Sequence, residues 1–124
     1  MMIGTRGSER MEIRSKDYSA GYDAITQTVS LQGTLRLAGA EEYAPITQLL
    51  EDAAAQPLSQ LTLNLRGLQF LNSSGINMLS KFVIKVRQRG NIQLIILGNN
   101  TIPWQGKSLK NLQRLMPSLQ LELE

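Results

Sequence analysis

Apolar and polar residues alternate along several short stretches of the chain, and such a stretch predicts a strand with one buried and one polar face. The clearest stretch covers residues 29–37. Further strands are predicted over residues 11–15, 61–65, 92–97 and 119–123. The strand over 92–97 is the most apolar, so we expect it near the centre of the sheet. Residues 16–23 hold a glycine and two tyrosines and are predicted to form a loop or turn.

Three other stretches place apolar residues three and four positions apart, which predicts helices with one buried side. They cover residues 41–55, 76–89 and 108–116. Ser108 is expected to be the N-cap of the third helix, and Gly90 the C-cap of the second. The predicted element order is therefore β-β-α-β-α-β-α-β.

This order predicts an α/β fold with a mixed, mostly parallel sheet, because helices that alternate with strands form right-handed crossovers between parallel strands. Three of the strands also have a polar second face. Since doubly covered parallel strands lack such a face, we expect the helices mainly on one side of the sheet. The first strand is expected to pair antiparallel with the second.

The length and composition of the chain predict one domain in the cytoplasm. The chain has 124 residues, a size that suits a single domain. Residues 1–9 are rich in Gly, Ser and Arg, so we expect a flexible tail there and the domain over residues 10–124. No apolar run approaches the roughly 20 residues that cross a bilayer, and the first residues show no secretory signal. We expect no contact with a membrane.

The amino acids that are missing disfavour catalysis. The chain contains no cysteine and no histidine, which removes thiolate ligands, the usual general base and the commonest metal ligand. We therefore expect no enzyme activity, no metal and no cofactor. The net charge is only +3, and no aromatic residues interleave the basic ones as a platform for bases would require. Nucleic acid is accordingly disfavoured as a partner.

The segment of most interest is the Ser-Ser-Gly sequence at residues 73–75, between the strand over 61–65 and the helix over 76–89. Two serines at a helix N-terminus can cap the helix, help to bind an anion, or carry a phosphate. A nucleophilic serine is disfavoured, because Leu71 occupies the position where a Gly-x-Ser-x-Gly elbow needs glycine and no histidine is present.

Residues 63–76, with the sequence LNLRGLQFLNSSGI, resemble the signature of STAS domains of the anti-sigma-factor antagonist type. In that family an aliphatic strand leads to an aromatic residue, an Asp-Ser-Ser-Gly loop and a helix. The resemblance implies a right-handed β-α superhelix over residues 10–124. It also implies a non-enzymatic regulator that binds a kinase-type anti-sigma factor, with a cognate phosphatase as a second partner. A weak homodimer is an open alternative.

The resemblance assigns roles to single residues of the loop. Ser73 corresponds to the serine that the kinase phosphorylates, Ser74 to the neighbouring cap, and Gly75 to a point of close backbone approach. Asn72 replaces the usual Asp, which keeps the hydrogen bonding and removes the charge. Two alternatives therefore stay open: an unphosphorylated scaffold subunit, and a nucleotide- or small-ligand-binding module.

The expected partner surface extends beyond the serines. It includes Asn72, Ser74, Gly75 and two positions of the strand over 29–37, Gly33 and Arg36. Arg36 stands where the family often has an acidic residue. Met78 is either a residue at the edge of the core or an exposed apolar contact one turn from the loop. Trp104 is expected to cover the core rather than to contact a partner.

Overall fold

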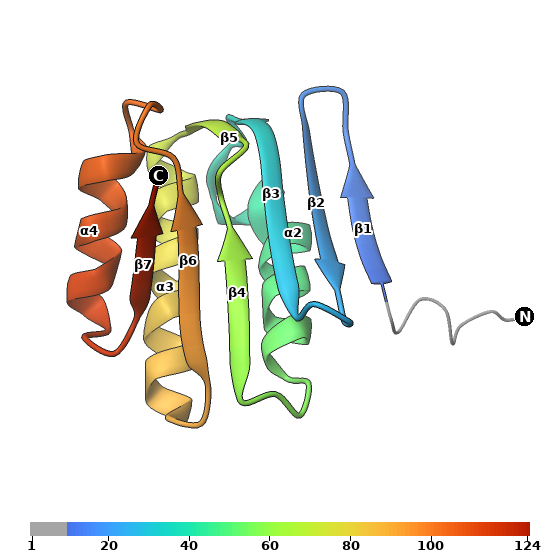
Figure 1. Ribbon diagram of the computed structural model, residues 1–124. Coiled ribbons are helices and arrows are strands. Elements are labelled where there is room, and N and C mark those ends of the chain that lie inside the picture. The colour runs from blue at the N-terminus through green and yellow to red at the C-terminus, as the bar shows by residue number, and fades with distance from the viewer. Residues whose placement is uncertain (1–9) are drawn as a thin grey trace, which may run out of the picture.

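The computed structural model describes residues 10–124, which form one mixed sheet covered on one face by helices (Figure 1). The predicted tail over residues 1–9 lies outside the described residues. The seven strands are β1 (Arg10–Arg14), β2 (Tyr18–Asp23), β3 (Thr28–Leu35), β4 (Gln60–Asn64), β5 (Leu68–Leu71), β6 (Gln93–Gly98) and β7 (Gln120–Leu123). The helices are α2 (Gly39–Ala54), α3 (Ser73–Arg89) and α4 (Gln105–Leu115).

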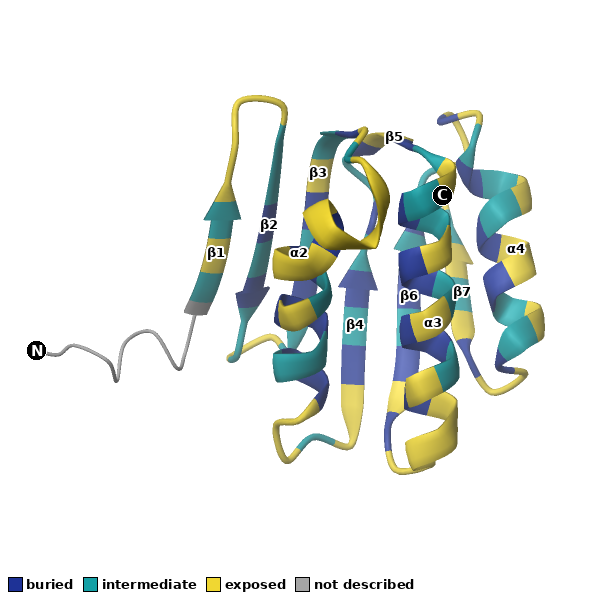
Figure 2. Ribbon diagram, turned by 180° about the vertical axis from the view of Figure 1, so that it is seen from behind, coloured by how far each residue is buried: buried dark blue, intermediate teal, exposed yellow. Residues whose placement is uncertain are grey.

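The sheet has the strand order β1-β2-β3-β4-β6-β7, and β5 pairs with β3 outside this path. The β1–β2 and β2–β3 pairs are antiparallel, and every other pair is parallel. The three helices lie on the same face of the sheet (Figure 2). The mostly parallel α/β sheet and the one-sided helices predicted from the alternation are thereby confirmed. The strand β6 has neighbours on both sides but is next to the edge strand β7, so its predicted central place is wrong.

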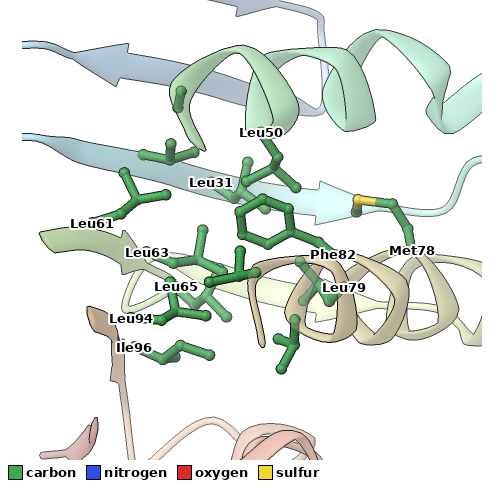
Figure 3. Close-up of a cluster of buried hydrophobic side chains, with 14 of the residues drawn as sticks. Leu31, Leu50, Leu61, Leu63, Leu65, Met78, Leu79, Phe82, Leu94 and Ile96 are labelled. Carbon is green, nitrogen blue, oxygen red and sulfur yellow. The ribbon is translucent and has the colours of Figure 1, made fainter. Parts of the chain in front are cut away.

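The core lies between the sheet and the helices. Inward side chains of β3, β4 and β6 meet those of α2 and α3 there (Figure 3). Its members include Leu31, Leu50, Leu61, Leu63, Leu65, Leu79, Phe82, Leu94 and Ile96. Alternate residues of the same strands point to the other face, as the period of two requires. On that face Ser30 of β3 and Asn64 of β4 are neighbours in register, and no described helix covers them (Figure 1).

The segment predicted as a loop over residues 16–23 is instead largely the strand β2. Its inward residues Ala20 and Tyr22 are buried in the core. A small residue and an amphipathic one make a weak apolar signal, so the alternation escaped detection. As a consequence the first strand pairs antiparallel with β2, and the predicted pairing with the strand over 29–37 is wrong.

Two helix starts also differ from the prediction. The helix α3 begins at Ser73 rather than Ile76, and α4 begins at Gln105 rather than Ser108. Ser108 is therefore inside α4, where Trp104 occupies the N-cap position. Gly90 is the C-cap of α3 in the left-handed region, with φ of 70°, as predicted.

Gly33 is the position at which β3 exchanges one parallel neighbour for another. Residues 28–30 of β3 pair with β4, and residues 33–35 pair with β5, with an irregular register at Gly33. Gly33 has φ of 92° and donates its N–H to the carbonyl oxygen of Gly67 at 3.0 Å. This bulge directs the end of β3 alongside β5, so that Leu35 and Leu71 become neighbours.

A buried amide fixes the connection between β4 and β5. The side chain of Gln105 is fully buried, and its Nε2 donates to the carbonyl oxygens of Leu65 at 2.7 Å and Leu68 at 3.0 Å. Its Oε1 accepts from the N–H of Asn99 at 2.7 Å. Trp104 adds a bond from its Nε1 to the same Leu68 oxygen at 3.0 Å. Trp104 is half-buried against the core, in keeping with the predicted covering role.

Replacing Gln105 by leucine is expected to lower the free energy of unfolding by about 1–3 kcal/mol. The carbonyl oxygen of Leu65 and the N–H of Asn99 lose their side-chain partner, and the carbonyl oxygen of Leu68 keeps only Trp104. The side chains have similar volumes, so packing changes little. Urea unfolding of Gln105→Leu checks this. The matched control is Gln88→Leu on the exposed side of α3. Equal stability of the two variants would contradict the role assigned to the buried amide.

Candidate functional site

The candidate site is the junction of β5 and α3, where the sequence predicted the functional loop. Asn72 lies between the two elements and is the N-cap of α3, with extended backbone at φ of −83° and ψ of 177°. Its Oδ1 accepts from the N–H of Gly75 at 3.0 Å. The predicted capping role of Ser74 is therefore wrong, because Asn72 occupies the position before the first helical turn.

Asn72 also joins α3 to two other segments. The hydroxyl of Tyr43, on α2, donates to Oδ1 of Asn72 at 2.7 Å. The Nδ2 of Asn72 donates to the carbonyl oxygen of Leu37, in the connection from β3 to α2, at 2.9 Å. An aspartate would supply the acceptor for Tyr43 and Gly75 but no donor for Leu37. The amide in place of the usual carboxylate thus has a local structural reason.

Tyr43 is suited to its role as a permanent donor. Its side chain is fully buried, and this burial raises the pKa of the Tyr43 phenol above its ordinary value. The hydroxyl therefore remains protonated at neutral pH. The carbonyl oxygen of Leu35 lies at 3.2 Å from the same hydroxyl. Because a phenol has one proton, the shorter contact to Asn72 takes it.

The capping residue is expected to contribute measurably to stability. Asn72→Ala should lower the free energy of unfolding by about 1–2 kcal/mol, since the cap bond is lost. Asn72→Asp should recover most of this loss, because a carboxylate also accepts from the Gly75 N–H and is favoured at a helix N-terminus. Urea unfolding measures both variants. A value for Asn72→Ala equal to that of the parent would exclude the capping role.

Gly75 is buried in the first turn of α3, and a side chain has no room there. A Cβ atom added to Gly75 would lie 2.2 Å from Cδ1 of Leu71 and 2.7 Å from the hydroxyl oxygen of Tyr43. The close approach predicted at Gly75 therefore involves two side chains of neighbouring elements. The glycine allows α3 to start directly against Tyr43.

The serines differ in exposure. Ser73 is the first residue of α3 and is exposed, whereas Ser74 is half-buried. Among residues 10–124, no hydrogen bond uses the hydroxyl of Ser73, because Asn72 supplies the cap. The Ser73 hydroxyl is therefore free to react or to contact a partner.

Arg36 and Phe70 lie beside this loop. The guanidinium carbon of Arg36 is 4.6 Å from the centre of the Phe70 ring, a cation–π contact. Phe70 is 37% exposed, and it was not among the predicted site residues. The signal available in the sequence was the aromatic residue two positions before Asn72, on a strand too short to show alternation. The Ser73 loop, defined here as residues 70–75, thus has an aromatic residue and a cation at its edge.

Two further predicted positions, Gly33 and Met78, lie outside the Ser73 loop. Gly33 is half-buried at the bulge of β3, where its environment is the backbone of residues 17 and 18. Met78 is buried, at 7% exposure, and faces α2. Within residues 10–124 no group of three or more acidic residues is arranged as a metal site. No helix in this part of the chain is long and apolar enough to cross a membrane.

Comparison with known families agrees with the fold. The profile of the STAS domain family matches residues 23–104, which include β3, β4, β5 and the Ser73 loop. The chain therefore belongs to the STAS domain family. A search among curated proteins found no significant match.

Solved structures with the same fold include two kinds of regulator. The chain is similar to SiaC of Pseudomonas aeruginosa, with a TM-score of 0.69 at 17% identity over 93% of this chain and 97% of SiaC. It is also similar to a chain in the structure of the diguanylate cyclase SiaD in complex with its activator SiaC, from the same organism. That match has a TM-score of 0.69 at 16% identity, over 92% of this chain and 99% of the other.

The second kind is an anti-sigma factor antagonist from Mycobacterium paratuberculosis. It matches with a TM-score of 0.57 at 17% identity, over 91% of this chain and 86% of the other. At these identities the comparisons show that the fold is shared.

Proposed function

We propose that this STAS-domain protein is a non-catalytic cytoplasmic regulator that acts by binding another protein through the Ser73 loop. The observation that carries the proposal is the state of Ser73, which is exposed at the first position of α3 while Asn72 supplies the cap. A serine released from capping can be modified without loss of the helix start. We further propose that residues 10–124 act as one domain.

The partner in this proposal is a serine-kinase-type anti-sigma factor, as in the antagonist family that the loop resembles. The kinase would phosphorylate Ser73 and thereby end the complex, and a phosphatase would restore it. Arg36, Asn72, Ser74 and Gly75 would belong to the contact surface or support it. The fold shared with an anti-sigma factor antagonist supports this choice.

A second candidate function has its own support. SiaC, which shares the fold, is an activator of the diguanylate cyclase SiaD. By this analogy the partner would be an enzyme that the chain activates. The neutral Asn72 in place of the usual Asp favours a member that acts as an unphosphorylated subunit.

The test is the phosphorylation state of the protein isolated from its native cells. Intact mass and a peptide map, before and after phosphatase treatment, should reveal a phosphate on Ser73 that phosphatase removes. The variant Ser73→Ala should lack it, and the exposed Ser118→Ala should retain it. A complex recovered without any phosphate, under all growth conditions, would overturn the kinase switch and favour the second candidate.

A further inference from the structure

A groove between α2 and α3 begins beside the Ser73 loop. It has a volume of about 380 Å³, and the two helices that form it lie side by side over the sheet (Figure 2). The wall on α2 includes Ala40, Ala44 and Thr47. These residues are spaced by four and three positions, so they form one stripe of that helix.

The wall on α3 has the same spacing. It includes Ser74, Met78 and Lys81. The side chains of Ala40, Ala44 and Thr47 are small, so they do not reach across to close the space. The floor includes Tyr43 and Phe82, which are 0% and 4% exposed. The groove therefore has an apolar floor between two regular helical stripes.

An ion pair closes the end of the groove that is far from the loop. Nζ of Lys85 on α3 bonds to Oε2 of Glu51 on α2, and both residues line the groove. From Ser74 to Lys85 the groove follows eleven helical steps, or about 16 Å at the rise of an α-helix. A helical segment of about ten residues has this length.

The charges along the groove favour an acidic occupant. Glu51 is already paired with Lys85. Lys81, in the middle of the α3 wall, is exposed and forms no ion pair within residues 10–124. The opposite end is the N-terminus of α3, whose first turn contains no acidic residue and whose potential favours negative charge.

We propose that the groove between α2 and α3 receives an acidic amphipathic helix of the protein partner. Apolar side chains of this helix would lie over Tyr43 and Phe82, and a carboxylate would pair with Lys81. This is the helix-in-groove mode of recognition, with anchors three and four residues apart. The inference rests on the proposed function, since it specifies the partner of the Ser73 loop.

The position of the groove explains how a phosphate would act. Ser74 belongs to both the Ser73 loop and the groove wall. A phosphate on Ser73 would place negative charge at the end of a groove that holds an acidic helix. Like charges at an interface oppose binding, so release follows from the charge of the partner.

The test uses a photo-crosslinking residue in the full chain, expressed in its native cells. The residue is placed at Thr47 in the groove, at Phe70 beside the loop, or at Ile25 as a control, which is 88% exposed. Gln48, also on the groove, replaces Thr47 if that variant does not fold. We expect capture of one protein from both Thr47 and Phe70, with the Thr47 crosslink on an acidic amphipathic segment.

The charge requirement is tested with the purified partner. Lys81→Glu should weaken binding by about tenfold, and Lys110→Glu on the exposed side of α4 should not. An acidic-to-lysine change in the captured segment should restore binding to Lys81→Glu. Unchanged affinity of Lys81→Glu, or a basic or uncharged captured segment, would overturn the proposal.

The crosslinks distinguish a partner bound in the groove from one bound at the Ser73 loop alone. Capture from Phe70 without capture from Thr47 or Gln48 overturns the groove and leaves the Ser73 loop as the contact surface. Capture from none of these positions above the Ile25 background overturns the proposed function as well.

Discussion

A phosphate on Ser73 is expected to weaken the complex with the partner by about 100-fold or more, while the free energy of unfolding of the chain changes by less than about 1 kcal/mol. The phosphate adds about −1.5 to −2 charges. At an interface, a like charge or a desolvated phosphate costs several kcal/mol, and each 1.4 kcal/mol is about a tenfold change in affinity. At its own helix N-terminus the same charge is mildly favourable.

The structure explains why a phosphate on Ser73 would affect partner binding more than it affects stability. Asn72 caps α3 through the N–H of Gly75, and Tyr43 holds the cap from α2. The phosphate would therefore replace no bond that the helix start needs. The hydroxyl of Ser73 takes part in neither hydrogen bond, so its modification changes the surface rather than the fold.

Two measurements on the same sample check the prediction. Phosphoserine is incorporated at position 73, and the partner is titrated by calorimetry while urea unfolding is followed separately. The control carries phosphoserine at Ser118, which is exposed in the connection from α4 to β7. Partner affinity equal to that of the unmodified chain would rule out the switch. A large loss of stability would show that phosphorylation acts on the fold instead.

Much of the fold follows from the sequence, because burial on one face leaves a periodic signal. The helices α2 and α3 and the strands β3, β4 and β6 all place their apolar residues toward one core, and each was predicted close to its observed position. The strand β2 was missed because Ala20 and Tyr22 are its buried residues. The strand β5 was missed because four residues are too few to establish a period.

The position of the candidate site could be predicted from the sequence, but the hydrogen bonds within it could not. The motif fixed the position of Ser73 at a helix start. The role of Asn72 depends on Tyr43 and Leu37, which are 29 and 35 positions away in sequence. Only the register of β3 with β5, and the docking of α2, bring these groups together. The groove could not be predicted for the same reason, because its two walls belong to different helices that only the fold brings side by side.

Gly33→Ala is expected to lower the free energy of unfolding by at least about 2 kcal/mol, from two independent causes. With φ of 92°, Gly33 has a backbone conformation that costs about 1–3 kcal/mol for a residue with a side chain. The added Cβ would also lie 2.3 Å from the carbonyl oxygen of Asp17 and 2.9 Å from Cα of Tyr18. Both contacts are with backbone, so no rotamer change relieves them.

The controls separate the two causes. Gly39→Ala introduces a Cβ at φ of 66° with no described atom within 4 Å, so it should show the conformational cost alone. Gly106→Ala lies in α4 with open space around it, and alanine there should be neutral or stabilising. We expect losses in the order Gly33, Gly39, Gly106, measured by urea unfolding.

The consequence for function distinguishes Gly33 from a contact residue. The bulge at Gly33 directs β3 alongside β5, and β5 leads into the Ser73 loop. If Gly33 acts through this register, Gly33→Ala should weaken partner binding only as far as it unfolds or displaces the loop, and the loss should diminish when a stabilising solute is added. If stability were unchanged and affinity fell, Gly33 would instead be a direct contact, as the sequence alone had predicted.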